Sequence, residues 1–339
     1  KISEKARVMP ASPIRKLVPY AEEAKRQGRK VYHLNIGQPD IHTPVASLDA
    51  LKKMDLKVIE YTHSAGNESY RRKLAQSYGK IGIAIDHTEI IVTTGGSEAV
   101  LFAFMSCLNP GEEVILLAPY WVSYYDQIIL AGGKPVVVEA TLENDFKIRP
   151  EQLEVVINKK TRLIIFNSPS NPTGMVYTRE EMEEIARVVQ KHEGLYIISD
   201  EIYEHILFKG EHVSMASFPY IYDKVITVNG VSKGYAMTGW RIGYIGAPLW
   251  LAKAVDKLQG QFTSGVCSIA QRAALAAITG DDGSRRMMRD AFLRRRDLVC
   301  KLLKEIKGMK VRVPQGAFYV MPDISYYLGK SDGEKLIRT

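Results

Sequence analysis

The chain alternates short, continuously apolar segments with longer amphipathic ones. The apolar segments are rich in Val and Ile, which is typical of strands covered on both faces. We predict seven strands, at residues 90–94, 114–118, 135–139, 163–167, 195–199, 225–229 and 241–245. We predict helices between and after them, at residues 97–108, 123–131, 178–191, 249–258 and 268–278. This alternation indicates βαβ units, and therefore an α/β fold with a mostly parallel sheet between layers of helices.

The two ends of the chain follow a different pattern. Near the N-terminus we predict a helix at about residues 14–27 and an extended segment at 31–36. Near the C-terminus we predict a long basic helix from about residue 289 and two strands, at 310–313 and 318–321. We therefore predict two domains: a large one at residues 44–288, and a smaller α+β domain formed by residues 1–43 and 289–339 together.

The composition is that of a folded protein. Of the 339 residues 46% are hydrophobic and 25% are charged, which excludes a disordered or collagen-like chain. The formal net charge of +8 favours anionic ligands. The densest basic segment, residues 285–296, is interrupted by an aspartate, so we interpret it as a solvated helix face and predict no nucleic-acid binding. No apolar run approaches the roughly 18 residues of a membrane helix, and we predict no membrane association.

The cysteines and the missing motifs exclude several classes of protein. Cys107, Cys267 and Cys300 lie far apart, which favours reduced thiols and a cytoplasmic location. No group of Cys and His has the spacing of metal ligands, so we predict no metal site. The chain also lacks the G-x-G-x-x-G, G-x-x-x-x-G-K-[ST] and H-E-x-x-H patterns, which argues against dinucleotide enzymes, P-loop enzymes and zincins.

Chemically useful side chains follow the predicted strands, where α/β proteins place their active sites. Residues 94–99 (TGGSEA) end a strand and open a helix, so their backbone N–H groups could bind an anion. Arg241 is suited to a phosphate. Taken alone, residues 94–99 could equally be a tight turn capped by Ser97, and residues 168–174 could be no more than a rigid turn.

Two further strand ends carry an acid and a base. Asp200 ends a buried strand, where a carboxylate is costly without a cationic partner, although it could also cap the next helix. Lys233 also ends a strand, where partial desolvation lowers the pKa of a lysine and frees its amine to attack a carbonyl. The alternative is an ordinary surface lysine. A reactive lysine, a strand-end carboxylate, an arginine and an anion cradle together predict a site for pyridoxal phosphate.

These residues lie in motifs that resemble a known family. The sequence is similar to the class I aminotransferases of pyridoxal-phosphate fold type I, in their bacterial aspartate-aminotransferase-like branch. The resemblance spans about residues 10–322 and covers seven ordered motifs and Tyr61. The motifs are residues 35–40 (NIGQPD), 94–99 (TGGSEA), 119–124 (PYWVSY), 171–174 (NPTG), 199–203 (SDEIY), 232–233 (SK) and 239–243 (GWRIG).

The resemblance implies a role for each matching residue. Lys233 would form the Schiff base with the cofactor and move the substrate proton, and Asp200 would keep the ring nitrogen protonated. Tyr203 and Asn171 would hydrogen-bond the phenolic oxygen of the ring, and Trp121 would stack on the ring, unless it is simply a core residue.

The resemblance also implies how the phosphate and the substrate are bound. The phosphate would be held by Gly96, Ser97, Glu98, Ser232 and Arg241. Tyr61 would reach the cofactor of a neighbouring subunit, which implies a homodimer with shared sites, unless it is an ordinary interface tyrosine. Gly37, Trp121 and Asn171 would contact the substrate.

The implied activity is transfer of an amino group from an L-amino acid to 2-oxoglutarate by a ping-pong mechanism, with aspartate as the leading donor. Ser97 stands where dicarboxylate-using relatives often have lysine, so an aromatic or kynurenine-type aminotransferase stays open. A C–S β-lyase on the same fold also stays open. A non-catalytic ligand sensor is disfavoured by the presence of both Lys233 and Asp200. The family's α-carboxylate arginine has no match, because Arg338 lies too early, so we expect the small domain to be incomplete at its C-terminus.

Overall fold

The computed structural model describes residues 2–55 and 57–331. Arg338 and the last residues of the predicted small domain lie outside this part of the chain. The chain separates into two compact units between Asp40 and Ile41. The predicted division into a large domain at residues 44–288 and a small domain at 1–43 and 289–339 stays a prediction.

The N-terminal unit contains two α-helices, α1 (Glu4–Val8) and α2 (Val18–Arg26). Ser3 caps α1 by accepting a hydrogen bond from the backbone of Ala6. The predicted helix at about 14–27 is present as α2, preceded by a single 3₁₀ turn at Arg15–Leu17. Pro19 is tolerated because it lies in the first turn of α2, where its missing N–H would have no partner within the helix. Residues 31–36 form no strand.

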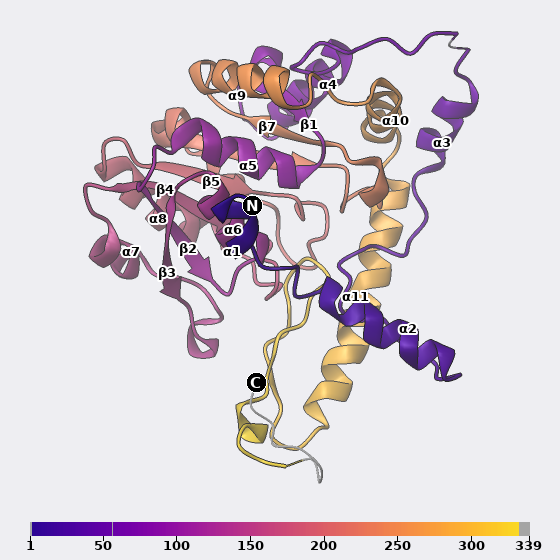
Figure 1. Cartoon of the computed structure of the whole chain (residues 1–339), viewed down its shortest axis with the longest axis vertical. Coiled ribbons are helices and arrows are strands. Elements are labelled where there is room, and N and C mark those ends of the chain that lie inside the picture. Colours follow the sequence, from indigo (N-terminus) through magenta and orange to yellow (C-terminus); the bar gives the residue numbers. More distant parts are fainter. Residues whose placement is uncertain (1, 56, 332–339) are drawn as a thin grey trace. The chain divides into compact units, whose positions relative to one another are not determined.

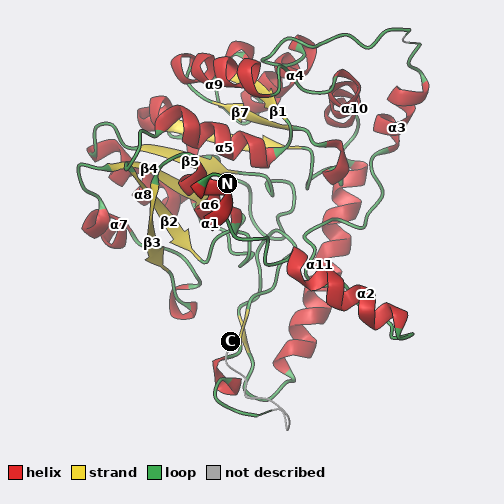
Figure 2. Ribbon diagram, viewed as in Figure 1, coloured by secondary structure: helices red, strands yellow, loops and turns green. Residues whose placement is uncertain are grey.

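The larger unit is built on a seven-stranded sheet, which confirms the predicted α/β fold (Figures 1 and 2). The strand order is β1-β7-β6-β5-β4-β2-β3. Strands β3, β2, β4, β5 and β6 pair in parallel, whereas β7 runs antiparallel to both of its neighbours. The strands are β1 (Ile90–Thr93), β2 (Glu113–Ala118), β3 (Lys134–Glu139), β4 (Thr161–Asn167), β5 (Tyr196–Asp200), β6 (Val225–Gly230) and β7 (Gly243–Gly246).

The strands agree with the sequence prediction to within two residues at each end. The largest differences are at β4, which begins at Thr161, and at β7, which begins at Gly243. Strand β7 begins later than predicted because Arg241 has a φ of 57°, which is outside the extended region. Arg241 is therefore a loop residue at the entrance to β7.

Helices cover both faces of the sheet. All five helices predicted between and after the strands are present, as α5 (Gly96–Cys107), α6 (Ser123–Leu130), α8 (Arg179–Lys191), α9 (Leu249–Phe262) and α10 (Ser268–Thr279). Thr178 and Glu181 form a capping box that opens α8. Helices α3 (Val45–Lys52), α4 (Glu68–Gly79) and α7 (Pro150–Val156) are additional. Their short or mostly polar sequences gave no clear apolar periodicity.

Neighbouring residues of one strand belong to two different cores. In β1, Ile90 and Val92 pack into a core with residues of α4, α8 and α10, while Ile91 packs into a second core with residues of α5 and α9. Because successive side chains of a strand point to opposite faces, this division places one core on each face of the sheet. It explains why the strands read as continuously apolar.

The C-terminal part of this unit begins with a long helix, α11 (Gly283–Lys304). A two-stranded antiparallel ladder follows, formed by β8 (Lys310–Val311) and β9 (Pro322–Asp323). The prediction of a strand at 318–321 is wrong, because the second strand of the ladder begins only at Pro322. Phe318 instead packs against the rings of Tyr203 and Phe292, so its segment is held by a third, smaller hydrophobic cluster.

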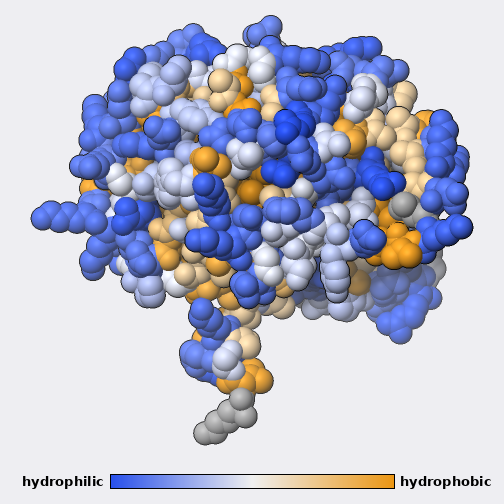
Figure 3. All heavy atoms as spheres, turned by 90° about the horizontal axis from the view of Figure 1, so that it is seen from above, coloured by the Kyte–Doolittle hydropathy of each residue, from blue (hydrophilic) through white to orange (hydrophobic). Residues whose placement is uncertain are grey.

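The surface is mostly hydrophilic on the face drawn in Figure 3, with apolar side chains in small groups between the charged ones. Among the described residues, no helix is long and apolar enough to cross a membrane. The three cysteines are all free thiols.

Candidate active site

Asp200 and Lys233 are carried by adjacent parallel strands. Asp200 is the last residue of β5 and is paired with Val228 of β6, and Lys233 follows the end of β6. Their charges interact, because the carboxylate of Asp200 raises the pKa of Lys233 and the ammonium of Lys233 lowers that of Asp200. The sheet therefore brings the predicted acid and the predicted amine to one edge.

The Asp200 carboxylate is buried but well hydrogen-bonded. Tyr124 Oη donates to Oδ2 at 2.6 Å, and the backbone N–H of Ile202 donates to Oδ1 at 3.2 Å. Burial raises the pKa of Asp200 to about 6, against the lowering effect of these two hydrogen bonds. Asp200 is consequently ionised at neutral pH, and it has a strong electrostatic preference for a cationic partner.

The neighbouring Glu201 serves a different purpose. Its Oε1 accepts hydrogen bonds from the hydroxyls of Ser199 and Ser214, both at 2.8 Å, and its Oε2 lies 3.0 Å from His212 Nε2. The side chain is buried and fully occupied by these contacts. Glu201 therefore anchors the end of β5 and leaves Asp200 as the carboxylate that lies close to Lys233.

The surroundings of Lys233 lower the pKa of its amine. Burial and, to a smaller extent, the guanidinium of Arg241 lower its pKa, Asp200 opposes both effects, and the net result is a pKa of about 8. Its Nζ lies 5.7 Å from the centroid of the Phe318 ring. The neutral amine, which a nucleophile or a general base requires, is therefore much more populated at neutral pH than for an ordinary lysine.

The start of α5 forms an anion cradle together with Arg241. Gly95 has a φ of 83°, and a Cβ at this position would lie 2.4 Å from Nη2 of Arg241. The guanidinium is fixed by hydrogen bonds from Nη1 to the carbonyl of Thr238, at 3.0 Å, and from Nη2 to that of Thr94, at 3.5 Å. Gly243 packs so closely behind the turn that its Cβ would lie 2.5 Å from the nitrogen of Gly96. Glycines at 95 and 243 are thus required by close approach.

Three predicted phosphate ligands lie on this cradle, and their groups differ in availability. The backbone N–H of Glu98 donates to the carbonyl of Gly95 at 3.2 Å, and the Glu98 carboxylate accepts from the N–H of Thr94 at 2.5 Å. Gly96 and Ser97 are the first two residues of α5, where N–H groups have no partner within the helix. These two N–H groups are the better anion donors of the three.

The hydroxyl of Ser232 provides a direct test of whether an anionic group fits here. It is buried, and among the described residues it has no hydrogen-bond partner. A buried hydroxyl without a partner is unfavourable by about 1–3 kcal/mol, so it calls for a ligand. The residues present therefore fit the phosphate of pyridoxal phosphate.

A second polar cluster surrounds Tyr203. Its hydroxyl lies 2.6 Å from that of Tyr319 and accepts a 3.5 Å hydrogen bond from Asn171 Nδ2. Asn171 Nδ2 also reaches the Tyr319 hydroxyl, at 3.4 Å. Burial holds the pKa of Tyr203 well above its usual range, so the phenol stays protonated. Trp121 is half-buried and meets the ring of Tyr124 edge-on, with centroids 5.2 Å apart.

Two predicted site residues are not brought to this cluster. Tyr61 is 96% exposed, and the apolar side chains of Val58 and Ile59 beside it are exposed as well. Gly37 belongs to the N-terminal unit, so its predicted contact with the substrate stays a prediction.

Sequence reasoning missed three residues that organise the site. Tyr124 hydrogen-bonds Asp200, Tyr319 hydrogen-bonds Tyr203, and Asn167 Nδ2 donates to the carbonyl of Asp200 at 2.8 Å. Tyr124 lies in the recognised PYWVSY motif and Asn167 ends a predicted strand, so both positions were flagged without a role. Tyr319 lies in the segment predicted to be a strand and in none of the recognised motifs, so the sequence predicts no role for it.

Comparison with known proteins identifies the family. The model of "Aminotransferase class I and II" matches residues 29–337, which is most of the chain. The chain belongs to the class I and II aminotransferase family. It is a transaminase of fold type I, and its cofactor is pyridoxal 5′-phosphate.

The named relatives within this family are aspartate aminotransferases. The aspartate/prephenate aminotransferase of Cereibacter sphaeroides is 44% identical over 330 residues, covering 96% of this chain and 82% of the relative. The aspartate aminotransferase of Geobacillus stearothermophilus is 42% identical over 307 residues, covering 89% of this chain and 78% of the relative.

Solved structures agree with the aminotransferase fold. An aspartate aminotransferase from Rhizobium meliloti superposes with a TM-score of 0.94 at 36% identity, covering 100% of this chain and 86% of the other. The Thermus thermophilus enzyme with maleate gives a TM-score of 0.92 at 38% identity, with coverages of 96% and 86%. The structural similarity therefore extends over nearly the whole chain.

Proposed function

We propose that this aminotransferase takes the amino group of L-aspartate and delivers it to 2-oxoglutarate by a ping-pong mechanism. The names of its relatives support aspartate as a substrate. The structural observation behind the chemistry is the pair of Lys233, with a pKa of about 8, and Asp200, with a pKa of about 6, at adjacent strand ends. Above about pH 6 this pair supplies a carboxylate, together with an amine that loses its proton more readily than an ordinary lysine does.

We infer the following division of labour. Pyridoxal 5′-phosphate supplies an aldehyde that bonds to amines and a ring that accepts the electron pair left when the substrate Cα loses its proton. Lys233 would hold the cofactor through its Nζ, and the same Nζ would remove the proton from the substrate Cα. Asp200 provides the negative charge that keeps the ring nitrogen protonated.

The other residues position the cofactor. Tyr203 and Asn171 would hydrogen-bond the phenolic oxygen, and Trp121 would cover the ring and border the substrate. The phosphate would sit on the N–H groups at the start of α5 and on the side chains of Ser232 and Arg241, with Glu98 holding the turn closed through Thr94. The unpartnered Ser232 hydroxyl is the contact that supports this placement best.

A second acceptor is favoured by the names of two relatives. The C. sphaeroides relative, at 44% identity, and a Rhizobium leguminosarum relative, at 42%, are both called aspartate/prephenate aminotransferases, the latter as probable. We therefore propose that prephenate is also an amino acceptor, alongside 2-oxoglutarate.

We also propose a homodimer with shared sites, in the cytoplasm. The support for a dimer is the exposed segment of Val58, Ile59 and Tyr61, since an almost fully exposed tyrosine flanked by exposed apolar residues favours a partner surface. The support for the cytoplasm is three unpaired cysteines. Tyr61→Phe is expected to weaken cofactor retention, while sedimentation velocity reports the dimer separately.

The activity is tested with a panel of amino donors. Each donor is mixed with enzyme and either 2-oxoglutarate or prephenate, and formation of the new keto acid and amino acid is followed. Aspartate should give the highest kcat/KM; a higher value for phenylalanine or kynurenine would replace the donor proposed here. Release of pyruvate and ammonia from cystathionine without an acceptor would instead identify a C–S lyase.

The role of Lys233 is tested by borohydride reduction. Reduction should fix the cofactor on a single peptide containing Lys233, and Lys233→Ala should abolish Cα proton exchange. The control is Lys257→Ala, which alters an exposed lysine of α9. Labelling of any other peptide would overturn the assignment.

A further inference from the structure

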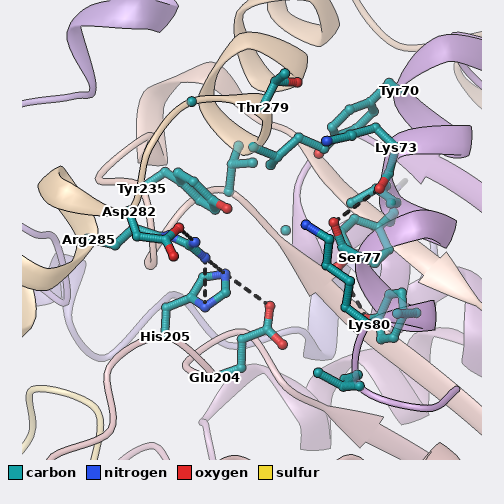
Figure 4. A pocket seen from close by; sticks show the side chains of 18 of the residues that line it. Tyr70, Lys73, Ser77, Lys80, Glu204, His205, Tyr235, Thr279, Asp282 and Arg285 are labelled. Atoms are coloured by element: carbon teal, nitrogen blue, oxygen red, sulfur yellow. Dashed lines mark hydrogen bonds and ion pairs between the residues drawn. The ribbon is translucent and has the colours of Figure 1, made fainter.

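A second cavity lies behind the loop that carries Lys233. It has a volume of about 420 Å³ and is walled by α4, the turn after β5, the end of β6 and the junction of α10 with α11 (Figure 4). Gly230, Val231 and Tyr235 line it and flank Lys233 on both sides, but Lys233, Asp200 and Arg241 do not line it. The cavity is therefore distinct from the cofactor site, although it shares a loop with it.

The cavity contains a buried hydroxyl that calls for a ligand. Tyr70 is 0% exposed, lines the cavity, and its hydroxyl has no hydrogen-bond partner among the described residues. Tyr78 and Tyr244 differ, because their hydroxyls lie 3.2 Å apart and satisfy each other. A buried phenol left without a partner is unfavourable unless something polar enters the cavity.

The charges around the cavity are only partly neutralised. Arg285 forms an ion pair with Asp282 and hydrogen-bonds His205, and Asp281 accepts a hydrogen bond from the N–H of Gly283 at 2.7 Å. By contrast, Lys73 and Lys80 form no ion pair with any described residue. The carboxylate of Glu204 lies 3.2 Å from His205 Nε2 and near His212, and it forms no ion pair with a lysine or arginine among the described residues.

The positions of these groups suit a zwitterion. In Figure 4, Lys80 and Glu204 reach toward the same hollow from different walls, with Tyr235 above Glu204 and His205. A carboxylate would be attracted to Lys73 and Lys80, and an ammonium group to Glu204. Leu74, Val231, Ile278 and the tyrosine rings add apolar side chains to the lining of the cavity. An aromatic side chain packs well against such rings.

We propose that this cavity is a second binding site, for an aromatic α-amino acid held by Lys80 at its carboxylate and by Glu204 at its ammonium group. The occupant would complete the hydrogen bonding of Tyr70. It would also press on the Lys233 loop, because His205 packs against the backbone of Gly234, where a Cβ would lie 2.6 Å from the ring. The site thereby connects a bound amino acid to the residue next to the reactive lysine.

Binding is measured by calorimetry on holoenzyme whose lysine–cofactor bond has been reduced by borohydride, so that no amino group is transferred. The probes are L-phenylalanine, L-tyrosine and L-tryptophan, together with 3-phenylpropanoate, which lacks the ammonium group, and 2-phenylethylamine, which lacks the carboxylate. At least one amino acid should bind, and each truncated probe should bind about tenfold more weakly or worse, since each loses one charged contact.

Substitutions of residues that line the cavity test whether the amino acid binds there. Lys80→Ala and Glu204→Gln should each weaken amino-acid binding about tenfold, whereas Lys253→Ala, the matched change on exposed α9, should leave it unchanged. Tyr70→Phe should raise the melting temperature of the free enzyme and still weaken binding. Unchanged transamination without added aromatic acid confirms that the variants are folded. Equal affinities in wild type, Lys80→Ala and Glu204→Gln would overturn the proposal, as would no binding of any of the three amino acids at about 10 mM.

Discussion

The hydroxyl of Tyr124 donates a 2.6 Å hydrogen bond to Oδ2 of Asp200, the carboxylate at the end of β5. This contact stabilises the ionised form of a carboxyl group whose burial favours the neutral form. A helix residue thus controls the charge of the residue that we propose as the partner of the cofactor ring. The electrostatics of the site depend on this pair as much as on Asp200 alone.

Tyr124→Phe should therefore shift the acidic limb of the pH profile upward. Removing a hydrogen bond that lowers the pKa of Asp200 leaves burial less opposed, so the carboxylate protonates at higher pH. A hydrogen bond to a charged group is worth about 1.5–3 kcal/mol, so the limb of kcat/KM should move by about one unit or more. Tyr125→Phe, a change in the adjacent exposed tyrosine, serves as the control. A limb in the wild-type position would remove Tyr124 from this role.

Asp200→Asn should slow transamination by about 100-fold or more and yet stabilise the cofactor-free protein. The pKa of Asp200 is about 6 in the folded chain against 3.8 as its ordinary value, so the folded state binds the proton more tightly. The free energy of unfolding accordingly falls as pH rises from about 4 to 6, by at most about 3 kcal/mol. Asparagine does not ionise, so the Asp200→Asn variant does not lose this stability as the pH rises.

The stability half of that prediction is checked by urea denaturation of cofactor-free protein at several pH values. Wild type and Asp200→Asn should have similar midpoints near pH 4.5, and the variant should have the higher midpoint at pH 7.5. A wild-type protein that becomes more stable between pH 4.5 and 6.5, relative to the variant, would contradict the burial argument.

Gly243→Ala should disrupt the anion cradle. The new Cβ would lie 2.5 Å from backbone atoms of Gly95 and Gly96, so either β7 or the start of α5 has to move. We expect a lower melting temperature and cofactor affinity reduced about tenfold or more, measured by equilibrium dialysis. Gly239→Ala is the matched control in the same loop region, because nothing lies within 4 Å of its Cβ position and it should behave as wild type.

Tyr319→Phe should lower kcat more than it changes stability. The variant removes the 2.6 Å contact with the Tyr203 hydroxyl and frees Tyr203 to reorient toward Asn171. Steady-state rates should fall a few-fold, and the pH dependence of the cofactor absorbance should shift, because the group proposed to bind the phenolic oxygen is less well positioned. An unchanged absorbance titration would assign Tyr319 a purely structural role.

The sheet and the strand-end residues followed from the sequence because each strand is covered on both faces. Seven continuously apolar segments are typical of such strands, and Asp200 and Lys233 stood out as charged residues at or shortly after the ends of two of them. The parallel arrangement then required both to lie at the same edge. This part of the site needed no knowledge of helix orientation.

The remainder depended on contacts that periodicity does not encode. Whether Tyr124 points to the sheet or to solvent depends on how α6 packs, and Tyr319 reaches Tyr203 only because Phe318 is held in the core. Helix α4 was missed because its sequence is mostly polar, although its few apolar residues are buried. Long-range packing of this kind is decided by the fold as a whole.

The one reversed strand, β7, determines what the site can contain. In a wholly parallel sheet, only residues that leave a strand reach the edge where ligands bind. Since β7 runs against β1 and β6, a residue that precedes β7 arrives at the edge that Thr94 and Lys233 reach by following their strands. Because β7 is antiparallel, Arg241 reaches the start of α5 just before its strand begins. If β7 were parallel, the residue before it would lie at the opposite edge of the sheet, and another residue would have to provide the positive charge.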